Sequence, residues 1–387
     1  MAEPVCDLVL LSWNHLEQTR PCLETLAGST TVPCRLFLVD NGSEPPVREF
    51  LRGVRPAGAI QEVVLLQNET NEGFPRGMNR GIRASRAPYV CLLNNDLRLT
   101  TGWLEELVAV AEAHPTLGVL NPNTSNLDNT PKGITLEAYA QRLRAARGQH
   151  LELGMCIGFC MLIKRAVLDA IGGLSEEVER IFFEDEDFCM RAQQAGFQCG
   201  VALGAYVFHA EHQTVKELPE REALFARNRR WCHGKWGRWV RMAWPRFTPV
   251  VPGSSELRHW LEQLLGFVRR RTLVYVYGPM PDGFSRDGLC RSVGLVPHAD
   301  LRWYAVPRAL APLAAAAMIL KRRKKRFNVI TAPTPGWGRW MRRFTPLHGA
   351  AVVPEDDDAR LRAEWARAAW RGLAEPAAPP RDGKTRP

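Results

Sequence analysis

Residues 89–96 read Tyr-Val-Cys-Leu-Leu-Asn-Asn-Asp, and this stretch decides the fold. A mostly apolar run of residues 89–93 is followed at once by three polar residues, Asn94, Asn95 and Asp96. A short apolar run with a polar boundary is typical of a strand that is buried on both faces of a parallel sheet. In parallel α/β sheets, ligands bind outside the carboxyl ends of the strands. The stretch therefore predicts a buried strand that carries Asp96 to a ligand-binding rim.

Two earlier apolar runs, residues 7–13 and 35–39, also predict buried strands, and amphipathic segments such as residues 73–85 predict the helices between strands. The first strand ends in Ser12-Trp13-Asn14 and the second in Asp40-Asn41-Gly42-Ser43. Any one of these clusters could be an ordinary turn, because Asn, Asp, Gly and Ser dominate turns. Three polar clusters on one rim favour a binding site.

The alternation of apolar runs and amphipathic segments continues to about residue 245, where Pro, Gly and Ser become frequent. We expect an α/β domain over residues 1–245. Residues 246–373 show two clear strand candidates, 273–277 and 328–332, among helical segments, and predict a small C-terminal α/β domain of unknown role. Residues 374–387 are rich in proline and charge and predict a disordered tail.

The composition is that of a globular protein, with 45% hydrophobic and 24% charged residues in 387. A net charge of +10 fits an anionic partner. No known nucleic-acid-binding module is recognisable, so we expect no nucleic acid. Ten scattered cysteines predict buried, reduced thiols. With no secretory signal at the start, the expected location is the cytoplasm.

The sequence has neither a Walker A motif nor a GxGxxG after the first strand, so a glycine-rich loop is not expected to hold phosphates. A bound nucleoside diphosphate then needs another counter-charge. A divalent metal held by carboxylates is the common solution, because hard cations take oxygen ligands and bridge phosphates. Asp96 is the predicted ligand.

Several motifs occur in a fixed order: a strand ending in Asn14, Val-Asp-Asn-Gly-Ser at 39–43, Asn-Glu-Gly-Phe at 71–74, Leu-Asn-Asn-Asp at 93–96, Phe-Glu-Asp-Glu-Asp at 183–187, and His209. Together they resemble the family-2 glycosyltransferases, especially the rhamnosyltransferase-like branch, over residues 5–240. The resemblance implies the GT-A fold, a mixed and mostly parallel sheet flanked by helices that binds a nucleotide-sugar.

The resemblance also implies roles for individual residues. Asp40 is similar to the aspartate that binds the nucleobase imide, which favours a UDP- or dTDP-linked donor. Asn79 is similar to a residue near the ribose and phosphates, and residues 94–96 occupy the DxD position, with an amide in place of the first carboxylate. His209 is similar to the histidine that completes the metal site, with His212 as a fallback, and Mn²⁺ or Mg²⁺ suits such a ligand set. The predicted nucleotide-sugar-binding residues are Ser12, Asn14, Asp40, Asn71, Gly73, Asn79, Asn94, Asn95 and Asp96.

The acidic run Glu184-Asp185-Glu186-Asp187 has two interpretations. Carboxylates at a helix start complement the helix dipole, and a carboxylate near an acceptor hydroxyl can act as a general base. The resemblance favours Asp185 as the base, with Glu184 second. Asp187 and Arg191 are spaced for a local ion pair. Residues 154–160, predicted as a strand, resemble the acceptor-side segment; a tightly packed core strand is the alternative.

These features predict an inverting, metal-dependent glycosyltransferase of glycan or cell-surface polysaccharide assembly, with a glycan, lipid-linked or protein acceptor. A nucleotidyltransferase and a non-catalytic nucleotide-sugar-binding module are the alternatives. The basic run at residues 321–326, from Lys321 to Arg326, could contact the inner face of a membrane. A solvated helix end is the other interpretation of this run.

Overall fold

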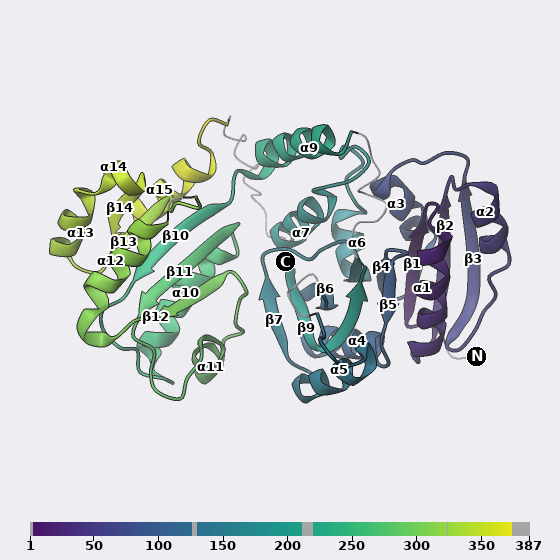
Figure 1. The fold of residues 1–387 in the computed structure, drawn as a ribbon, viewed down its shortest axis with the longest axis horizontal. Helices are drawn as coiled ribbons and strands as arrows, with labels where there is room; N and C mark the ends of the chain where they lie inside the picture. Colours follow the sequence, from purple (N-terminus) through teal and green to yellow (C-terminus); the bar gives the residue numbers. More distant parts are fainter. Residues whose placement is uncertain (1–2, 126–129, 211–219, 323, 374–387) are drawn as a thin grey trace, which may run out of the picture. The chain divides into compact units, whose positions relative to one another are not determined.

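The computed structural model describes residues 3–125, 130–210, 220–322 and 324–373. Contacts divide the chain into two units, residues 1–229 and 230–387 (Figure 1). The division falls before the expected boundary at residue 245, because strand β10 (Val240–Pro245) is the central strand of the second sheet. Residues 374–387, the predicted disordered tail, lie outside the described residues.

A nine-stranded mixed sheet forms the first unit, in the order β3-β2-β1-β4-β8-β6-β9-β5, with β7 paired to β9. The strands are β1 (Cys6–Ser12), β2 (Cys34–Asn41), β3 (Ile60–Asn68), β4 (Tyr89–Leu93), β5 (Leu97–Leu99), β6 (Leu117–Asn123), β7 (His150–Leu153), β8 (Cys160–Lys164) and β9 (Gln198–His209). Strands β3, β2, β1 and β4 are parallel, and β8 runs antiparallel to β4. The predicted mixed α/β fold is confirmed. The four parallel strands end at one rim, as expected from their polar termini.

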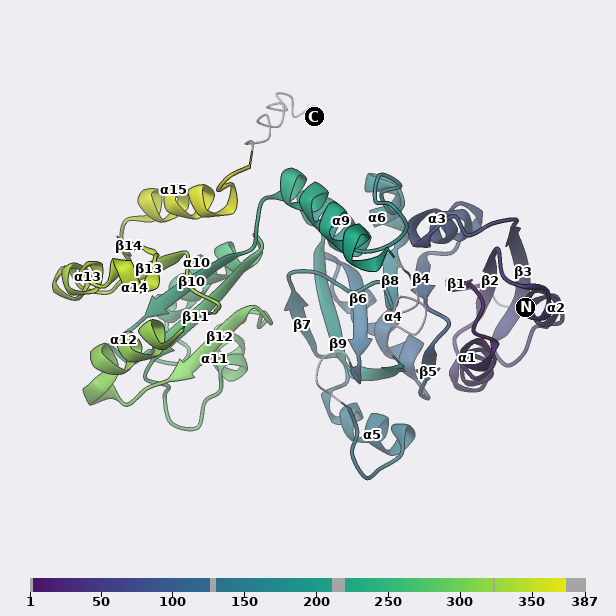
Figure 2. The ribbon, with the colours of Figure 1, turned by 45° about the horizontal axis from the view of Figure 1, so that its top comes forward.

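Helices cover both faces of this sheet, and Figure 2 shows α3 and α6 on one side with α1 and α4 on the other. The first unit contains α1 (Leu16–Ser29), α2 (Pro45–Arg52), α3 (Phe74–Ala84), α4 (Trp103–Ala113), α5 (Leu136–Leu143), α6 (Arg165–Ile171) and α7 (Glu184–Gln194); α9 (Arg221–Trp236) crosses the division. Apolar residues of α1, α2 and α4 pack in one core cluster, and those of α3, α6 and α7 in another. Strand β4 is buried along its whole length between them, as its apolar run predicts.

One local prediction in this unit is wrong. Residues 154–159, expected to be part of a strand, form an irregular segment before β8. Here the Cys156 amide donates to Cys189 Sγ and the Ile157 amide to Asn121 Oδ1, so these backbone groups bond to side chains and not to a neighbouring strand.

The second unit is a wholly parallel five-stranded sheet in the order β12-β11-β10-β13-β14. Its elements are β10 (Val240–Pro245), α10 (Ser255–Val268), β11 (Thr272–Gly278), α11 (Arg286–Ser292), β12 (Leu301–Ala305), α12 (Ala311–Lys321), β13 (Val329–Ala332), α13 (Pro335–Arg342), α14 (Thr345–His348), β14 (Ala351–Pro354) and α15 (Asp358–Ala369). Of its strands, only β11 and β13 were expected. Edge strand β12 is partly exposed, so it lacks the long apolar run of a buried strand.

All ten cysteines are free and buried, as predicted. Within the described ranges, no helix is long and apolar enough to cross a membrane.

Candidate active site

A cavity of about 310 Å³ lies in the first unit beyond the carboxyl ends of β1, β2 and β4. Its walls come from the polar end of β4 (residues 94–96), the irregular segment before β8, residues 180–186 and His209. Strand order explains the convergence, because these segments follow neighbouring strands of one sheet. The cavity therefore lies where the sequence predicts a ligand site.

Asp96 and His209 form a pair on the floor of this cavity. Strand β5 pairs with the end of β9 so that Leu97 lies opposite His209, and this register brings the residue before β5 to the histidine. Asp96 Oδ1 is 3.1 Å from His209 Nε2, and both side chains are nearly buried. The imidazole ring stacks on Phe159 with ring centroids 5.2 Å apart. The predicted aspartate and histidine are therefore adjacent.

The pair fits a divalent metal. Buried Asp96 Oδ1 accepts no hydrogen bond from the described residues, so it keeps its lone pairs for a cation. A carboxylate oxygen beside an imidazole nitrogen is a donor set for Mn²⁺ or Mg²⁺ completed by ligand oxygens. Asn94 Nδ2 lies 3.4 Å from the same His209 nitrogen. The fallback ligand His212 lies outside the described residues.

Asn95 and Ser12 both contact Thr19 of α1, next to the rim of the sheet. The Asn95 amide donates to Thr19 Oγ1 at 2.9 Å, and Ser12 Oγ lies 3.2 Å from that same hydroxyl. Ser12 is fully buried and does not line the cavity. Its contacts join β1 to α1, so the structure gives Ser12 a packing position and leaves Asn95 at the cavity wall.

The acidic run forms the first turn of α7. Asp185 and Glu184 both line the cavity. Asp185 is held by two backbone amides: Gly158 N–H donates to Oδ2 at 3.1 Å and Glu186 N–H to Oδ1 at 2.8 Å. The expected ion pair is confirmed, with Arg191 Nε donating to Asp187 Oδ2 at 2.8 Å. Thus Asp187 fixes the helix and Asp185 faces the cavity.

Burial changes the proton affinity of both candidate bases. Desolvation raises the pKa of Asp185 to about 6, and the amide hydrogen bonds from Gly158 and Glu186 oppose that rise. Desolvation and the neighbouring Asp185 charge raise the pKa of Glu184 well above its usual range. Glu184 Oε2 is also buried without a hydrogen-bond partner in the described part of the chain. At neutral pH Asp185 can accept a proton, whereas Glu184 has its protonated form favoured by burial and by the Asp185 charge.

Asn71 and Gly73 lie at the cavity beside Asn41, a residue that the sequence interpretation left out of the site. Asn41 Nδ2 donates to Asn71 Oδ1 at 2.9 Å, and its Oδ1 accepts from Asn68 Nδ2 at 2.8 Å. Gly73 has φ = +85°, and a Cβ there would lie 2.7 Å from Arg180 Cα. Glycine is therefore required at this turn.

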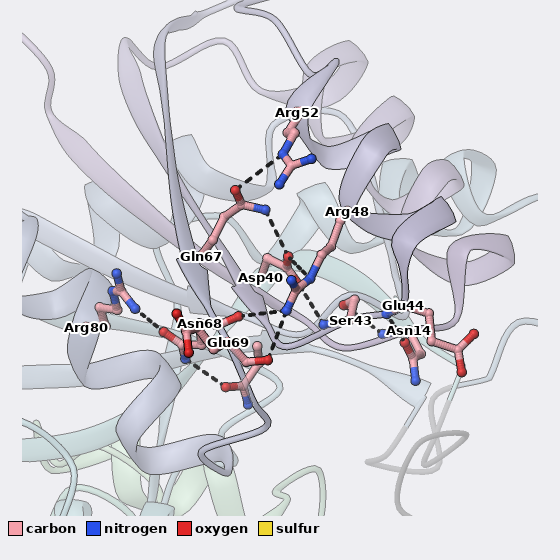
Figure 3. A network of polar contacts seen from close by, with 11 residues as sticks. Asn14, Asp40, Ser43, Glu44, Arg48, Arg52, Gln67, Asn68, Glu69 and Arg80 are labelled. Carbon is pink, nitrogen blue, oxygen red and sulfur yellow. Dashed lines mark hydrogen bonds and ion pairs between the residues drawn. The ribbon is translucent and has the colours of Figure 1, made fainter.

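Asp40 and Asn14 lie outside the cavity in a polar network (Figure 3). Fully buried Asp40 accepts hydrogen bonds from Ser43 N–H at 2.9 Å and Gln67 Nε2 at 3.2 Å, and Arg48 Nε is 3.5 Å from its Oδ2. Asn14 Oδ1 accepts from Glu44 N–H at 2.9 Å. The Asp40 carboxylate, which was expected to bind a nucleobase, thus already contacts Ser43, Gln67 and Arg48.

Asn79 is also away from the cavity. Its Nδ2 donates to Leu174 O and to Glu176 Oε1, both at 2.9 Å, and its Oδ1 accepts from Leu174 N–H at 2.8 Å. All of its polar atoms are used in joining α3 to the segment after α6. The structure therefore places Asn79 in a structural clamp, and its predicted contact with ribose and phosphates has no counterpart in the cavity lining.

Several cavity residues were missed by sequence reasoning. Phe182 and Phe183 precede α7, and Phe225 comes from α9. Asn228, on the same helix, donates to Glu179 O at 2.9 Å and Ile181 O at 2.8 Å. The one available signal was the asparagine itself, because asparagine is a weak helix former and stands here among better ones. The phenylalanines carried no signal apart from their nearness to the acidic run.

A mixed α/β sheet whose rim holds an aspartate–histidine pair and a second acidic motif is the arrangement that the sequence motifs predict. Residues 7–172, which make up most of the first unit, match the model of glycosyl transferase family 2, a family of transferase enzymes. The closer resemblance to the rhamnosyltransferase-like branch stays a prediction.

Relatives and solved structures share only distant similarity. An uncharacterized protein of Sinorhizobium fredii is 25% identical over 60% of this chain, which spans 28% of that protein's length. A pre-mycofactocin glycosyltransferase of Mycobacterium tuberculosis is 24% identical over 89% of this chain and 72% of its own length. A mannosyltransferase from Pyrobaculum calidifontis, solved with GDP-Man and Mn²⁺, is 13% identical, with a TM-score of 0.42 over 95% of this chain and 88% of its own.

Proposed function

We propose that the first unit transfers a sugar from a UDP- or dTDP-linked donor to an acceptor hydroxyl with inversion, using Mn²⁺ or Mg²⁺. The supporting observation is one cavity that contains both the Asp96–His209 pair and Asp185. The Asp96–His209 pair suits a leaving diphosphate, and Asp185 suits an incoming acceptor hydroxyl. The acceptor belongs to glycan or cell-surface polysaccharide assembly, as a glycan, a lipid-linked sugar or a protein.

Asp96 and His209 would hold the metal, whose chemistry is to neutralise charge on the departing nucleoside diphosphate. Asp185 accepts the proton of the acceptor hydroxyl as the acceptor oxygen bonds to the anomeric carbon and the bond from that carbon to the diphosphate breaks. One displacement from the opposite face inverts the anomeric configuration. The amides of Gly158 and Glu186 orient the Asp185 carboxylate for this step.

Binding is tested by thermal shift with UDP-glucose, dTDP-glucose and GDP-mannose, each with Mn²⁺, Mg²⁺ or chelator. We expect a metal-dependent rise in melting temperature for a uridine or thymidine donor, because a ligand that binds the folded state stabilises it. Equal shifts for all three nucleotides would remove the uridine or thymidine preference. Equal shifts with and without metal would remove the metal role.

The alternatives differ in what they release. A glycosyltransferase frees nucleoside diphosphate when acceptor is present, whereas a nucleotidyltransferase frees pyrophosphate from a nucleoside triphosphate and a sugar phosphate. A non-catalytic binding module frees neither. Product analysis by ion-exchange chromatography separates the three.

Peripheral membrane binding through residues 321–326 is a separate proposal. Arg322 lies 4.2 Å from the Tyr275 ring centroid, so one cation of the run is engaged within the second unit. Co-sedimentation with anionic and neutral liposomes tests whether the run binds a membrane. The wild type is compared with a variant that has serine at the described basic positions Lys321, Arg322, Lys324, Lys325 and Arg326. Equal binding by both proteins would exclude the membrane contact.

A further inference from the structure

The second unit has a reversal of strand order of its own. Its chain starts in the central strand β10, continues outward through β11 and β12, and then crosses to β13 and β14 on the other side. Helices α10 and α11 pack in one core cluster with Trp244 of β10, and α12 and α13 pack in another with Ala243. Successive residues of a strand point to opposite faces, so the helices after the neighbouring strands β10 and β13 cover opposite faces. Open parallel sheets bind ligands outside the carboxyl ends of the strands at such a point.

A cavity of about 730 Å³ lies at this place in the second unit. Pro333 directly follows β13 and Glu355 directly follows β14, and both residues line the cavity. Helix α10 supplies Gln263 and α13 supplies Arg342, so helices from both faces of the sheet contribute to it. The volume is within the range of small-molecule sites. All lining residues belong to the second unit, so this cavity is separate from the candidate active site.

Glu355 has a fixed side chain at the end of β14. Its N–H donates to Ala332 O at 3.2 Å, which joins it to the end of β13. Its Oε1 accepts from Trp244 Nε1 at 2.9 Å and from Trp260 Nε1 at 3.1 Å, and both tryptophans are buried. Within the described part of the chain, the other oxygen, Oε2, accepts no hydrogen bond. An oriented carboxylate oxygen is thus available to a ligand in the cavity.

The charged groups of the cavity disfavour a phosphate and a metal ion. Four carboxylates and only two guanidinium groups line it, in a chain with a net charge of +10. One of these guanidinium groups, Arg362, already donates to Asp358 Oδ2 at 2.7 Å, so a phosphate would meet an excess of negative charge. Among the residues that the structure describes, the acidic and histidine side chains of this cavity do not bring three ligand atoms within 4.8 Å of one another. The ligand is therefore expected to be neutral.

The cavity also has an apolar part. It is formed at the strand ends by Ala332, Pro333, Pro335 and Pro354. The walls thus combine aliphatic surface with charged hydrogen-bond acceptors and donors. A sugar ring offers the complementary groups, because one side of it presents C–H groups and its hydroxyls need hydrogen-bond partners once they leave water.

We propose that this cavity binds a neutral sugar unit of a glycan, with Glu355 Oε2 accepting from its hydroxyl groups. The inference concerns the second unit alone and goes beyond the transfer reaction proposed for the first. It agrees with a glycan acceptor. A glycan held by one unit stays at high effective concentration for the other, because both units belong to one chain.

The test is ligand-observed saturation-transfer NMR on the full chain, with chelator and without nucleotide. The neutral probes are the methyl glycosides of glucose, galactose, mannose and rhamnose, and the anionic probes are methyl glucuronide and glucose 6-phosphate. We expect at least one neutral glycoside to bind with a Kd below about 10 mM, and the anionic probes to bind about fivefold more weakly or worse. Absence of binding by all four neutral glycosides, or tighter binding of an anionic probe, would overturn the proposal.

Glu355→Gln isolates the carboxylate. The amide oxygen can keep both indole hydrogen bonds while an NH₂ group replaces Oε2, so the variant should melt as wild type and lose about tenfold in affinity for the bound glycoside. Glu256→Gln is the matched control on α10: it lies outside the cavity lining, loses an ion pair with Arg246 at 3.0 Å, and should change neither value. Unchanged affinity in Glu355→Gln contradicts the proposed site.

Asp356→Asn gives a second measurement that does not involve the tryptophans. Asp356 is exposed and lines the cavity beside Glu355, so the substitution should keep the melting temperature and weaken binding by about threefold. If Glu355→Gln melts below wild type, this variant decides, and wild-type affinity in it would place sugar binding elsewhere. If the donor fails to bind in the thermal-shift panel while the glycoside binds here, the transfer reaction is wrong and this site stands.

Discussion

Asp96 and Asp185 are carboxylates of one cavity in opposite circumstances. Asp96 Oδ1 accepts no hydrogen bond from the described residues and lies 3.1 Å from an imidazole nitrogen. Asp185 accepts two backbone amides, one on each oxygen, and its pKa is raised to about 6. The first arrangement is suited to a cation and the second to a proton. The surroundings therefore assign different chemistry to the same side chain.

The largest effect is expected from Asp96→Ala. We expect metal-dependent turnover to fall to background and the metal-dependent thermal shift with donor to vanish, because the carboxylate of the pair is lost. Turnover and thermal shift are measured with and without Mn²⁺. Asp169→Ala, at an exposed aspartate of α6, is the matched control and should behave as wild type. Wild-type metal response in Asp96→Ala would place the metal elsewhere.

Asp185→Asn should lower kcat by roughly 10²–10⁴-fold, the usual contribution of a general base, and leave donor affinity unchanged. Stability gives a second readout. Because the folded-state pKa is raised, the protonated form favours folding, and this contribution is lost as pH rises through about 6. The neutral amide should therefore lack this pH dependence of the melting temperature. A full transfer rate in this variant would exclude Asp185 as the base.

The pH profile of the wild-type enzyme sharpens the same assignment. Below about pH 6 Asp185 is protonated and cannot accept the acceptor proton, so kcat should rise with pH through that value. Asp185→Asn should lack this rise in its residual rate. A wild-type rate that is flat from pH 5 to pH 8 would contradict the assignment.

A smaller effect is expected from Asn228→Ala, which removes the hydrogen bonds to Glu179 O and Ile181 O that hold the turn before Asp185. We expect about tenfold lower kcat with unchanged donor affinity, because misplacing a catalytic group costs rate more than binding. Asn328→Ala is the control: Asn328 Oδ1 accepts from Arg241 N–H in the second unit, so it too loses a backbone contact and should keep wild-type kcat. If kcat falls equally in both variants, the Asn228 effect comes from a general loss of folding stability and not from the position of Asp185.

The sequence predicts the residues whose positions follow from strand ends. Strand β4 occupies its predicted residues, and Asp96 lies three residues after its end. His209 and Asp185 were assigned through motif order, and both lie in the same cavity as Asp96. Periodicity alone could not pair β5 with β9, which is the long-range register that brings Asp96 to His209.

Residues whose side chains form internal contacts were harder to place. Asp40 and Asn79 stand in the expected motifs, yet Gln67 and Leu174 bond to them from distant segments. Sequence shows that a polar group is present, and only the fold shows whether protein atoms already satisfy it. Phe182 and Phe225 were missed for the reverse reason, because apolar residues look like core until the fold places them at a cavity.

The smallest expected effect comes from Glu184→Gln. This variant tests whether Asp185 alone accepts the proton in the cavity, while Asp96 binds the cation. Burial and the adjacent Asp185 charge raise the pKa of Glu184 well above its usual range, so its protonated form is favoured. Glutamine retains the shape and neutral charge, and kcat should change by less than about threefold. Removing the Glu184 proton-binding site should leave the rise in rate near pH 6 in place. If Glu184→Gln loses as much rate as Asp185→Asn, the two carboxyl groups share the proton and act as one coupled base.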